Sequence, residues 1–470
     1  MREVIERSRS EETTDLGVEI SNIKATSGAF TPSGVKSLIL YYYKGLLMTE
    51  ENEKFPALLI IGPPGIGKST VVREAAEEIS KRLGKTLVDI TSLETRRQVL
   101  KDIDRCLGTG SSSKCINDLP YFVFLDLRLT EVEPADLVGV PRVIRSKGVE
   151  FMEYIPPSWA KILHYLPGIL FLDELSNVNR VDVMSVAYKI LLDRSAGFIN
   201  FNKNVMVIAA GNQPEHAPGI SQPLPPPVLS RCIVIYMDAP TIDEWYKWMI
   251  DAVNRRFVFR ERVEESLRLL DLVYAFVSMY PEHFMSLSLR QKRNENFPTP
   301  RNWSNMVFTL EYTVLKKLAE TWNIDALTSI VASYVGERTA NEIVPMFVDG
   351  IRINIDEFID NPQKISEFVN EVKDDRAKLN RLIALVGALA SRLRYSAHVI
   401  DEEKLLKIID EVRRAGDGLR TGLGCSFTRV IYKSLNQALA SAVRQGGVSN
   451  TLELVAVISK YIDDNCTKQM

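Results

Sequence analysis

The sequence contains little that points to a metal centre, a disulfide framework or a membrane span. Its four histidines are dispersed without metal-ligand spacing, and its five cysteines include no C-x-x-C pair. The longest apolar runs are too short to cross a bilayer, and the N-terminus lacks a signal-peptide core. An odd, scattered set of thiols predicts reduced cysteines in a cytoplasmic protein. These cysteines are Cys106, Cys115, Cys232, Cys425 and Cys466.

The chain also lacks an excess of charge of either sign. Its net charge is −2 over 470 residues, so it has no overall basic field, and nucleic acid is not the default partner. With 46% hydrophobic and 25% charged residues, the composition is that of an ordinary globular protein. The length exceeds what one hydrophobic core usually serves, so two to four domains are expected.

Between residues 57 and 237, apolar strands alternate with amphipathic helical stretches, which predicts a parallel α/β sheet. The apolar runs are continuous, as expected for strands covered on both faces. The expected strands are Ala57–Ile61, Tyr121–Leu127, Gly168–Leu172, Asn204–Ala209 and Cys232–Tyr236. After residue 237 helical patterns dominate, interrupted over residues 349–364 by a segment expected to be a linker or a small excursion.

A glycine-rich stretch lies between the first strand and a helix expected over residues 70–83. Glycines allow backbone N–H groups to turn inward around a phosphate, and the helix N-terminus adds partial positive charge. We therefore predict a phosphate-binding loop of a nucleotide site, in which Lys68 reaches the outer phosphates and the Ser69 hydroxyl binds Mg2+. The loop comprises Gly62, Pro63, Pro64, Gly65, Ile66, Gly67, Lys68, Ser69 and Thr70.

Two adjacent acids, Asp173 and Glu174, end the strand that begins at Gly168. The carboxyl ends of parallel strands line the crevice in which such sheets bind ligands. Asp173 is predicted to hold Mg2+ and Glu174 to activate the attacking water. A plainer interpretation is a helix N-cap followed by a first-turn acid.

Two further polar residues lie beside strand ends. Asn212, after the strand Asn204–Ala209, is predicted to point at the γ-phosphate, although an asparagine after glycine is also a common turn residue. Arg231 precedes the strand at Cys232. It could stabilise charge on a phosphoryl group bound by a neighbouring subunit, or be a solvated arginine at a helix end.

In this order, these motifs resemble the AAA+ ATPases, and within them the MoxR branch of the helix-2-insert group, over about residues 32–318. The resemblance assigns Walker A to the glycine-rich loop, Walker B to Ile169–Glu174, sensor 1 to Asn212 and the arginine finger to Arg231. It assigns sensor 2 to Arg301 in the stretch Thr-Pro-Arg-Asn-Trp, and whether Arg301 acts on its own or a neighbour's nucleotide stays open.

Two short excursions match the position of that group's hairpins. Residues 142–154 form two β-prone arms around a Lys-Gly turn, and residues 196–200 precede the sensor 1 strand. Between them, Asn179 is expected to cap a helix. The resemblance then implies that residues 30–239 form an α/β P-loop core, which contains the insert hairpin. A flexible tail over 1–29, a helical lid over 240–348 and a helical extension over 349–470 complete the predicted division.

The resemblance implies an ATPase that forms a ring, in which six subunits are expected, and remodels a protein partner. A von Willebrand-type domain, the frequent partner of MoxR proteins, would lie on another chain. A DNA-translocating motor is the alternative because related helicases share the insert. Against it, Arg142, Arg145 and Lys147 at the insert are offset by Glu150 and Glu153. A slowly hydrolysing nucleotide switch is the third hypothesis.

Overall fold

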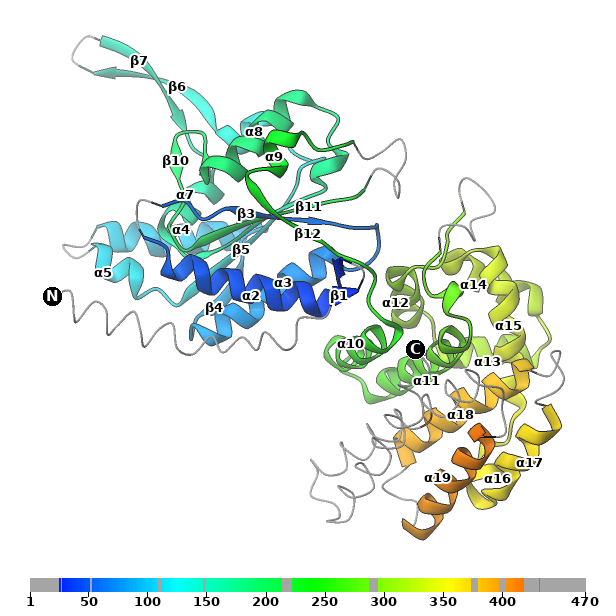
Figure 1. The fold of residues 1–470 in the computed structure, drawn as a ribbon. Helices are drawn as coiled ribbons and strands as arrows, with labels where there is room; N and C mark the ends of the chain where they lie inside the picture. The colour runs from blue at the N-terminus through cyan, green and yellow to red at the C-terminus, as the bar shows by residue number, and fades with distance from the viewer. Residues whose placement is uncertain are drawn as a thin grey trace. The chain divides into compact units, whose positions relative to one another are not determined.

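The computed structural model describes residues 25–26, 28–50, 53–108, 112–146, 149–213, 222–286, 295–372, 379–396, 402–417 and 431. The chain divides into two compact units, residues 1–240 and 241–470, which are coloured blue to green and green to orange (Figure 1). In the described part of the chain, no helix is both long and apolar enough to cross a membrane.

The first unit is built on a six-stranded parallel sheet in the order β12-β3-β11-β8-β5-β4. The predicted α/β class is confirmed, and so are the five expected strands to within two residues at each end. The sixth, β4, was not predicted. The strands are β3 (Ala57–Ile61), β4 (Thr86–Asp89), β5 (Tyr121–Arg128), β8 (Gly168–Asp173), β11 (Val205–Gly211) and β12 (Cys232–Tyr236).

Helices cover both faces of this sheet, which explains why its central strands are apolar at nearly every position. On one face α3 (Lys68–Arg82) contacts β5, β8 and β11, and α2 (Pro32–Met48) packs beside α3. On the other face α4 (Leu93–Leu107), α7 (Ser158–Tyr165) and α8 (Val181–Asp193) share one apolar core with the strands.

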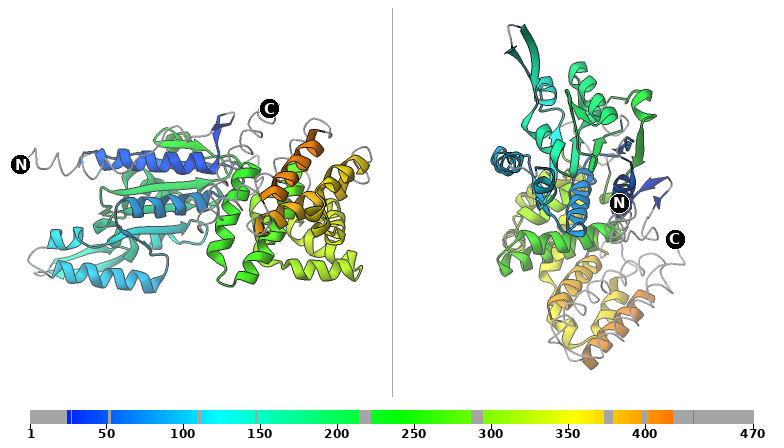
Figure 2. Two further views of the ribbon diagram at one scale, coloured as in Figure 1. Left: turned by 90° about the horizontal axis from the view of Figure 1, so that it is seen from below. Right: turned by 90° about the vertical axis from the view of Figure 1, so that its left-hand side faces the viewer.

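Two hairpins interrupt the α/β alternation. The first pairs β6 (Val140–Ser146) with β7 (Val149–Ile155), and both strands extend away from the sheet in two views (Figures 1 and 2). It follows the short helix α6 (Pro134–Val138). The second pairs β9 (Ser195–Ala196) with β10 (Ile199–Asn200). Both hairpins lie where the sequence predicted them.

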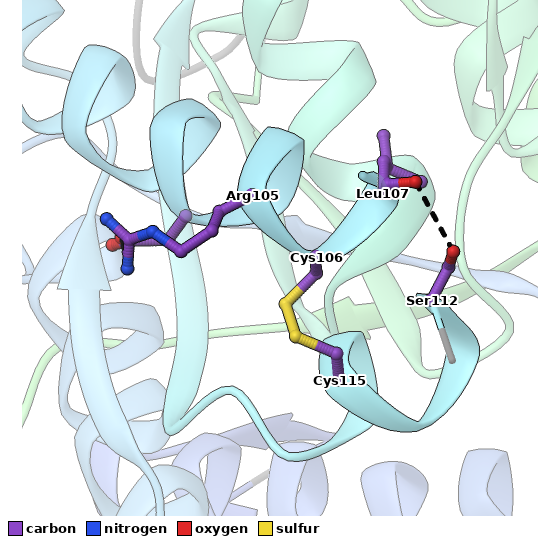
Figure 3. The surroundings of a disulfide bond; sticks show 6 residues. Arg105, Cys106, Leu107, Ser112 and Cys115 are labelled. Atoms are coloured by element: carbon purple, nitrogen blue, oxygen red, sulfur yellow. Dashed lines mark hydrogen bonds and ion pairs between the residues drawn. A yellow bond between two sulfur atoms is a disulfide. The ribbon is translucent and has the colours of Figure 1, made fainter. Parts of the chain in front are cut away.

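The expectation that all cysteines are reduced is wrong for two of them. Cys106 near the end of α4 is disulfide-bonded to Cys115 in α5 (Ser112–Asn117), and the two helices meet at this bond (Figure 3). The Ser112 hydroxyl also donates to the Leu107 carbonyl, 3.4 Å away. A pairing between residues nine apart depends on how the chain turns between the helices, which the spacing alone did not reveal.

The second unit is helical throughout its described part and has one continuous apolar core, which runs from Trp245 to Ile431. Within it α11 packs closely against α18. The absence of a side chain at Gly387 allows this approach, since a Cβ atom there would lie 2.7 Å from Cδ2 of Leu272. The helices are α10 (Ile242–Arg256), α11 (Arg260–Met279), α12 (Pro300–Thr309), α13 (Tyr312–Glu320), α14 (Ile324–Val335), α15 (Glu337–Arg352), α16 (Ile355–Asp360), α17 (Gln363–Val372), α18 (Leu379–Ser396) and α19 (Glu402–Asp417).

Three local predictions differ from the structure. Residues 349–364 are not a linker, because α15 and α16 occupy most of them and bury Phe358 and Ile359. The end of the predicted tail forms a small hairpin, β1 (Ala25–Thr26) with β2 (Ala29–Phe30). Arg180, not Asn179, occupies the N-cap position of α8.

The expected lid boundary at residue 348 lies within α15, and the division into lid and extension stays a proposal.

Candidate active site

The loop between β3 and α3 turns back over the end of the sheet, and two of its glycines are required there. Gly67, the N-cap of α3, has φ +95°, a conformation that disfavours other residues. At Gly62 a Cβ atom would lie 2.2 Å from the Met237 carbonyl oxygen. The glycine pattern therefore reflects one turn and one close approach of two backbones.

Lys68 extends its ammonium group across the mouth of this loop. Its Nζ donates to the carbonyl oxygens of Gly62 at 2.9 Å and Pro63 at 2.8 Å, and to Oδ1 of Asn212 at 2.8 Å. Asn212 comes from the end of β11, the strand between β3 and β8. The predicted sensor amide and the predicted phosphate-binding lysine thus lie in direct contact.

Ser69 and the two acids meet at the same edge. The Ser69 hydroxyl donates to Oδ2 of Asp173 at 2.7 Å, and Oδ1 of Asp173 accepts the backbone N–H of Glu174 at 2.8 Å. Glu174 has φ +61°, a left-handed conformation that costs a non-glycine residue about 1–3 kcal/mol. Glu174 occupies the N-cap position of the helical turn Leu175–Asn177, and its side chain forms no cap bond there.

Sequence reasoning missed two residues that hold these groups. Thr130, just after β5, donates its hydroxyl to Oε2 of Glu174 at 2.9 Å. Ser176 accepts the backbone N–H of Asn212 at 2.7 Å and thereby joins the segment after β8 to the segment after β11. Neither residue belongs to a local motif, and only the adjacency of strands brings them to the site.

A third missed residue is Asp126 on β5. It pairs with Phe171 on β8, on the same sheet face as Asp173 two residues later. Burial, and secondarily the nearby negative charge of Asp173, raise the pKa of Asp126 to about 6. Its Oδ1 atom is buried and has no hydrogen-bond partner in the described part of the chain.

Arg231 lies at the other edge of the sheet, and Arg301 belongs to the second unit. Arg231 is exposed and immediately precedes β12, whose pairing with β3 runs from Cys232–Ala57 to Tyr236–Ile61. Arg231 is therefore at the amino edge of the sheet, whereas the glycine-rich loop is at the carboxyl edge. Arg301 is exposed in the first turn of α12 in the second unit.

The site combines a strand, a phosphate-binding type of loop and a helix with an acid pair at the end of another strand of the same parallel sheet. This is the arrangement expected of a P-loop nucleotide site. Residues 58–236 match the family described as "ATPase family associated with various cellular activities (AAA)". This segment is an AAA ATPase domain. It coincides closely with the sheet, from the second residue of β3 to the last residue of β12.

Solved structures similar to the chain include those of an AAA domain and of an ATPase. The FIGL-1 AAA domain is 13% identical, with 70% of this chain and 83% of that chain covered and a TM-score of 0.28. The same domain in complex with ADP is 13% identical, with 62% of this chain and 87% of that chain covered and a TM-score of 0.25. A protein from Cytophaga hutchinsonii that is assigned as an ATPase is 14% identical, with 73% of this chain and 86% of that chain covered and a TM-score of 0.28. At these TM-scores the likenesses do not bear on function. No curated protein matches the sequence.

The AAA domain offers oxygen donors that suit Mg2+. Ser69 and Asp173 present a hydroxyl and a carboxylate in contact, and hard oxygen ligands of this kind are those that Mg2+ prefers. Among the described residues, no group of three or more acids, histidines or cysteines could hold an ion alone. Phosphate oxygens and water would therefore have to supply the remaining ligands, as is usual for Mg2+ at nucleotide sites.

Proposed function

We propose that this protein is a ring-forming AAA+ ATPase of the MoxR type that hydrolyses ATP with Mg2+ and remodels a protein partner. The observation that carries the proposal is the separation of Arg231 from Lys68. The two residues lie at opposite ends of adjacent strands β12 and β3, which are five residues or about 16 Å long. An exposed arginine so placed suits a phosphate bound by another copy, not by its own chain.

Within one subunit, the residues of the loop bind and orient the triphosphate. Lys68 already presents its ammonium where outer phosphate oxygens would replace its present carbonyl partners. Ser69 and Asp173 would hold Mg2+, which neutralises charge on the phosphate oxygens when it is bound. Glu174 accepts a proton from the attacking water, and Asn212 orients that water or the γ-phosphate.

Between subunits, Arg231 stabilises the charge that develops on the transferring phosphoryl group. Each copy contributes its loop to one contact and its arginine to the next, which is a head-to-tail arrangement. Such contacts close into a ring when the rotation permits, and six subunits are proposed here. Arg301 is proposed as sensor 2, acting in cis or in trans. Loss of the γ-phosphate contacts would then release the subunit interface.

The partner is proposed to be a protein because of the surface of the first hairpin. Its charges cancel across the strands: Arg145 forms a 2.6 Å ion pair with Glu150, and Arg142 lies opposite Glu153. The described part of the hairpin therefore offers no net positive charge to a phosphate backbone. It exposes large apolar side chains instead, among them Val143 at 63% and Met152 at 60%.

The second hairpin continues this apolar surface. Phe198 is 80% exposed, and its ring lies 5.5 Å from the ring of Tyr154 on β7. Lys189 on α8 donates to the Gly197 carbonyl at 3.0 Å and lies over the Phe198 ring. The two hairpins are thus in contact through Phe198 and Tyr154, and they are proposed to grip the same protein segment.

The test uses Glu174→Gln protein, which should bind ATP but hydrolyse it slowly, and therefore retain its partner. We expect a retained protein that is lost when Val143 and Met152 are both replaced by serine. Val181→Ser, which changes an even more exposed apolar residue on α8, should retain it. Stimulation of the wild-type ATPase by DNA that disappears as salt rises would instead support a DNA motor and contradict the proposal.

A further inference from the structure

Three acids lie in a row on the face of the sheet that α3 covers. Asp89 ends β4, Asp126 lies on β5 and Asp173 ends β8, and these strands are neighbours. Asp126 pairs with Phe171, which lies two residues before Asp173 on β8. Asp126 is therefore on the same face of the sheet as Asp173 but further from its carboxyl edge. The row ends at the Mg2+ donors Ser69 and Asp173.

Helix α3 supplies partners to the two outer acids of this row but none to the middle one. Ser69 donates to Asp173 at 2.7 Å. Arg73, one turn further along α3, forms a 2.7 Å ion pair with Asp89. In the described part of the chain, no hydrogen bond from α3 reaches the Asp126 carboxylate, and its Oδ1 atom is buried without a partner.

The charges around Asp126 do not compensate it. Asp173 and Asp89 are both negative and raise its energy when it is ionised, while Arg73 is already paired with Asp89. Arg128, the other cation nearby, forms a 3.3 Å ion pair with Glu131. A carboxylate beside a carboxylate, with a buried oxygen and no paired cation, is an unfavourable arrangement unless a cation binds next to it.

We propose that Asp126 accepts a hydrogen bond from the water shell of the Mg2+ held by Ser69 and Asp173, and so helps to bind the hydrated ion. Mg2+ sheds its water reluctantly and keeps several molecules at nucleotide sites, so acceptors beyond the direct ligands contribute to its affinity. The inference rests on the proposed nucleotide site and adds a residue to it. It does not depend on ring formation or on Arg231.

The test measures binding of Mn2+, which substitutes for Mg2+, to wild-type and variant protein saturated with ADP, by the loss of the free Mn2+ paramagnetic resonance signal. Asp126→Asn keeps the shape of the side chain and removes its charge. We expect its Kd for Mn2+ to rise about tenfold or more. Its affinity for ADP in EDTA should be unchanged or higher, because a negative charge near the phosphates is removed.

Asp89→Asn is the matched control, since it removes an acid from the same row but one that Arg73 neutralises. Its Mn2+ affinity should remain within twofold of wild type. Equal weakening in both variants would show a diffuse charge effect and contradict the inference, as would wild-type Mn2+ affinity in Asp126→Asn. Asp126→Ser serves the same purpose should the asparagine variant fail to fold. Wild-type protein that binds no ADP would overturn this inference and the proposed function together.

Discussion

The hydroxyl of Thr130 donates a 2.9 Å hydrogen bond to Oε2 of Glu174. The contact is built by the sheet, because the backbone N–H of Leu129 continues the β5–β8 ladder to the carbonyl oxygen of Asp173 at 3.1 Å. Thr130 and Glu174 therefore each follow directly after the last rung between two paired strands. The side chain of the proposed general base is held by a residue outside its own motif.

Thr130→Val removes this donor while preserving the shape of the side chain. We expect kcat for ATP to fall about three- to tenfold with little change in KM, because Glu174 loses orientation without any change in the phosphate-binding loop. Thr130→Ser keeps the hydroxyl and should retain most of the activity. A valine variant whose KM rises while kcat is unchanged would place Thr130 in binding instead.

Gly62→Ala tests the close approach of two backbones at the loop. The added Cβ would lie 2.2 Å from the Met237 carbonyl oxygen, so β3 and the segment after β12 would have to separate. We expect a lower melting temperature for the first unit and weaker ADP binding. Gly84→Ala, at a glycine of positive φ with no atom within 4 Å of the added Cβ, is the control for backbone strain alone. If both variants lose ADP binding equally, the close approach is not the reason.

Reduction of the Cys106–Cys115 bond should destabilise the first unit. Closing a loop between residues nine apart stabilises a folded chain by about 2–3 kcal/mol through the entropy of the unfolded state. For a unit of this size the melting temperature should fall about 5–10 °C in reductant. Peptide mapping of unreduced protein should find the two cysteines linked, and free thiols at both would contradict the pairing.

His283 gives the second unit a dependence on pH. Burial lowers the pKa of this histidine, whose Nδ1 lies 3.1 Å from the Thr339 hydroxyl. Below pH about 6.5 the unfolded chain takes up a proton there that the folded chain does not, so its contribution to stability is lost as pH falls. His283→Asn keeps a polar atom near the Nδ1 position. Its melting temperature should fall less between pH 7.5 and 5.5 than that of wild type, and an equal fall in both proteins would contradict the prediction.

The sequence predicts best those features that depend on neighbouring residues. Continuous apolar runs predicted five of the six strands, including the half-buried edge strand β12, but β4 has only four residues, begins with an exposed threonine and was missed. Asp126 and Thr130 could not be found because their role depends on the pairing of β5 with β8. The disulfide likewise depends on how α4 and α5 meet.

The claim on which the proposed mechanism depends is that each nucleotide is shared between copies, with Lys68 from one and Arg231 from the next. Lys68→Ala and Arg231→Ala proteins should each be inactive alone. Mixed subunits should regain part of the ATPase rate, because some interfaces then combine an intact loop with an intact arginine. A mixture that stays inactive, while dilute monomeric wild-type protein hydrolyses ATP, would contradict the account.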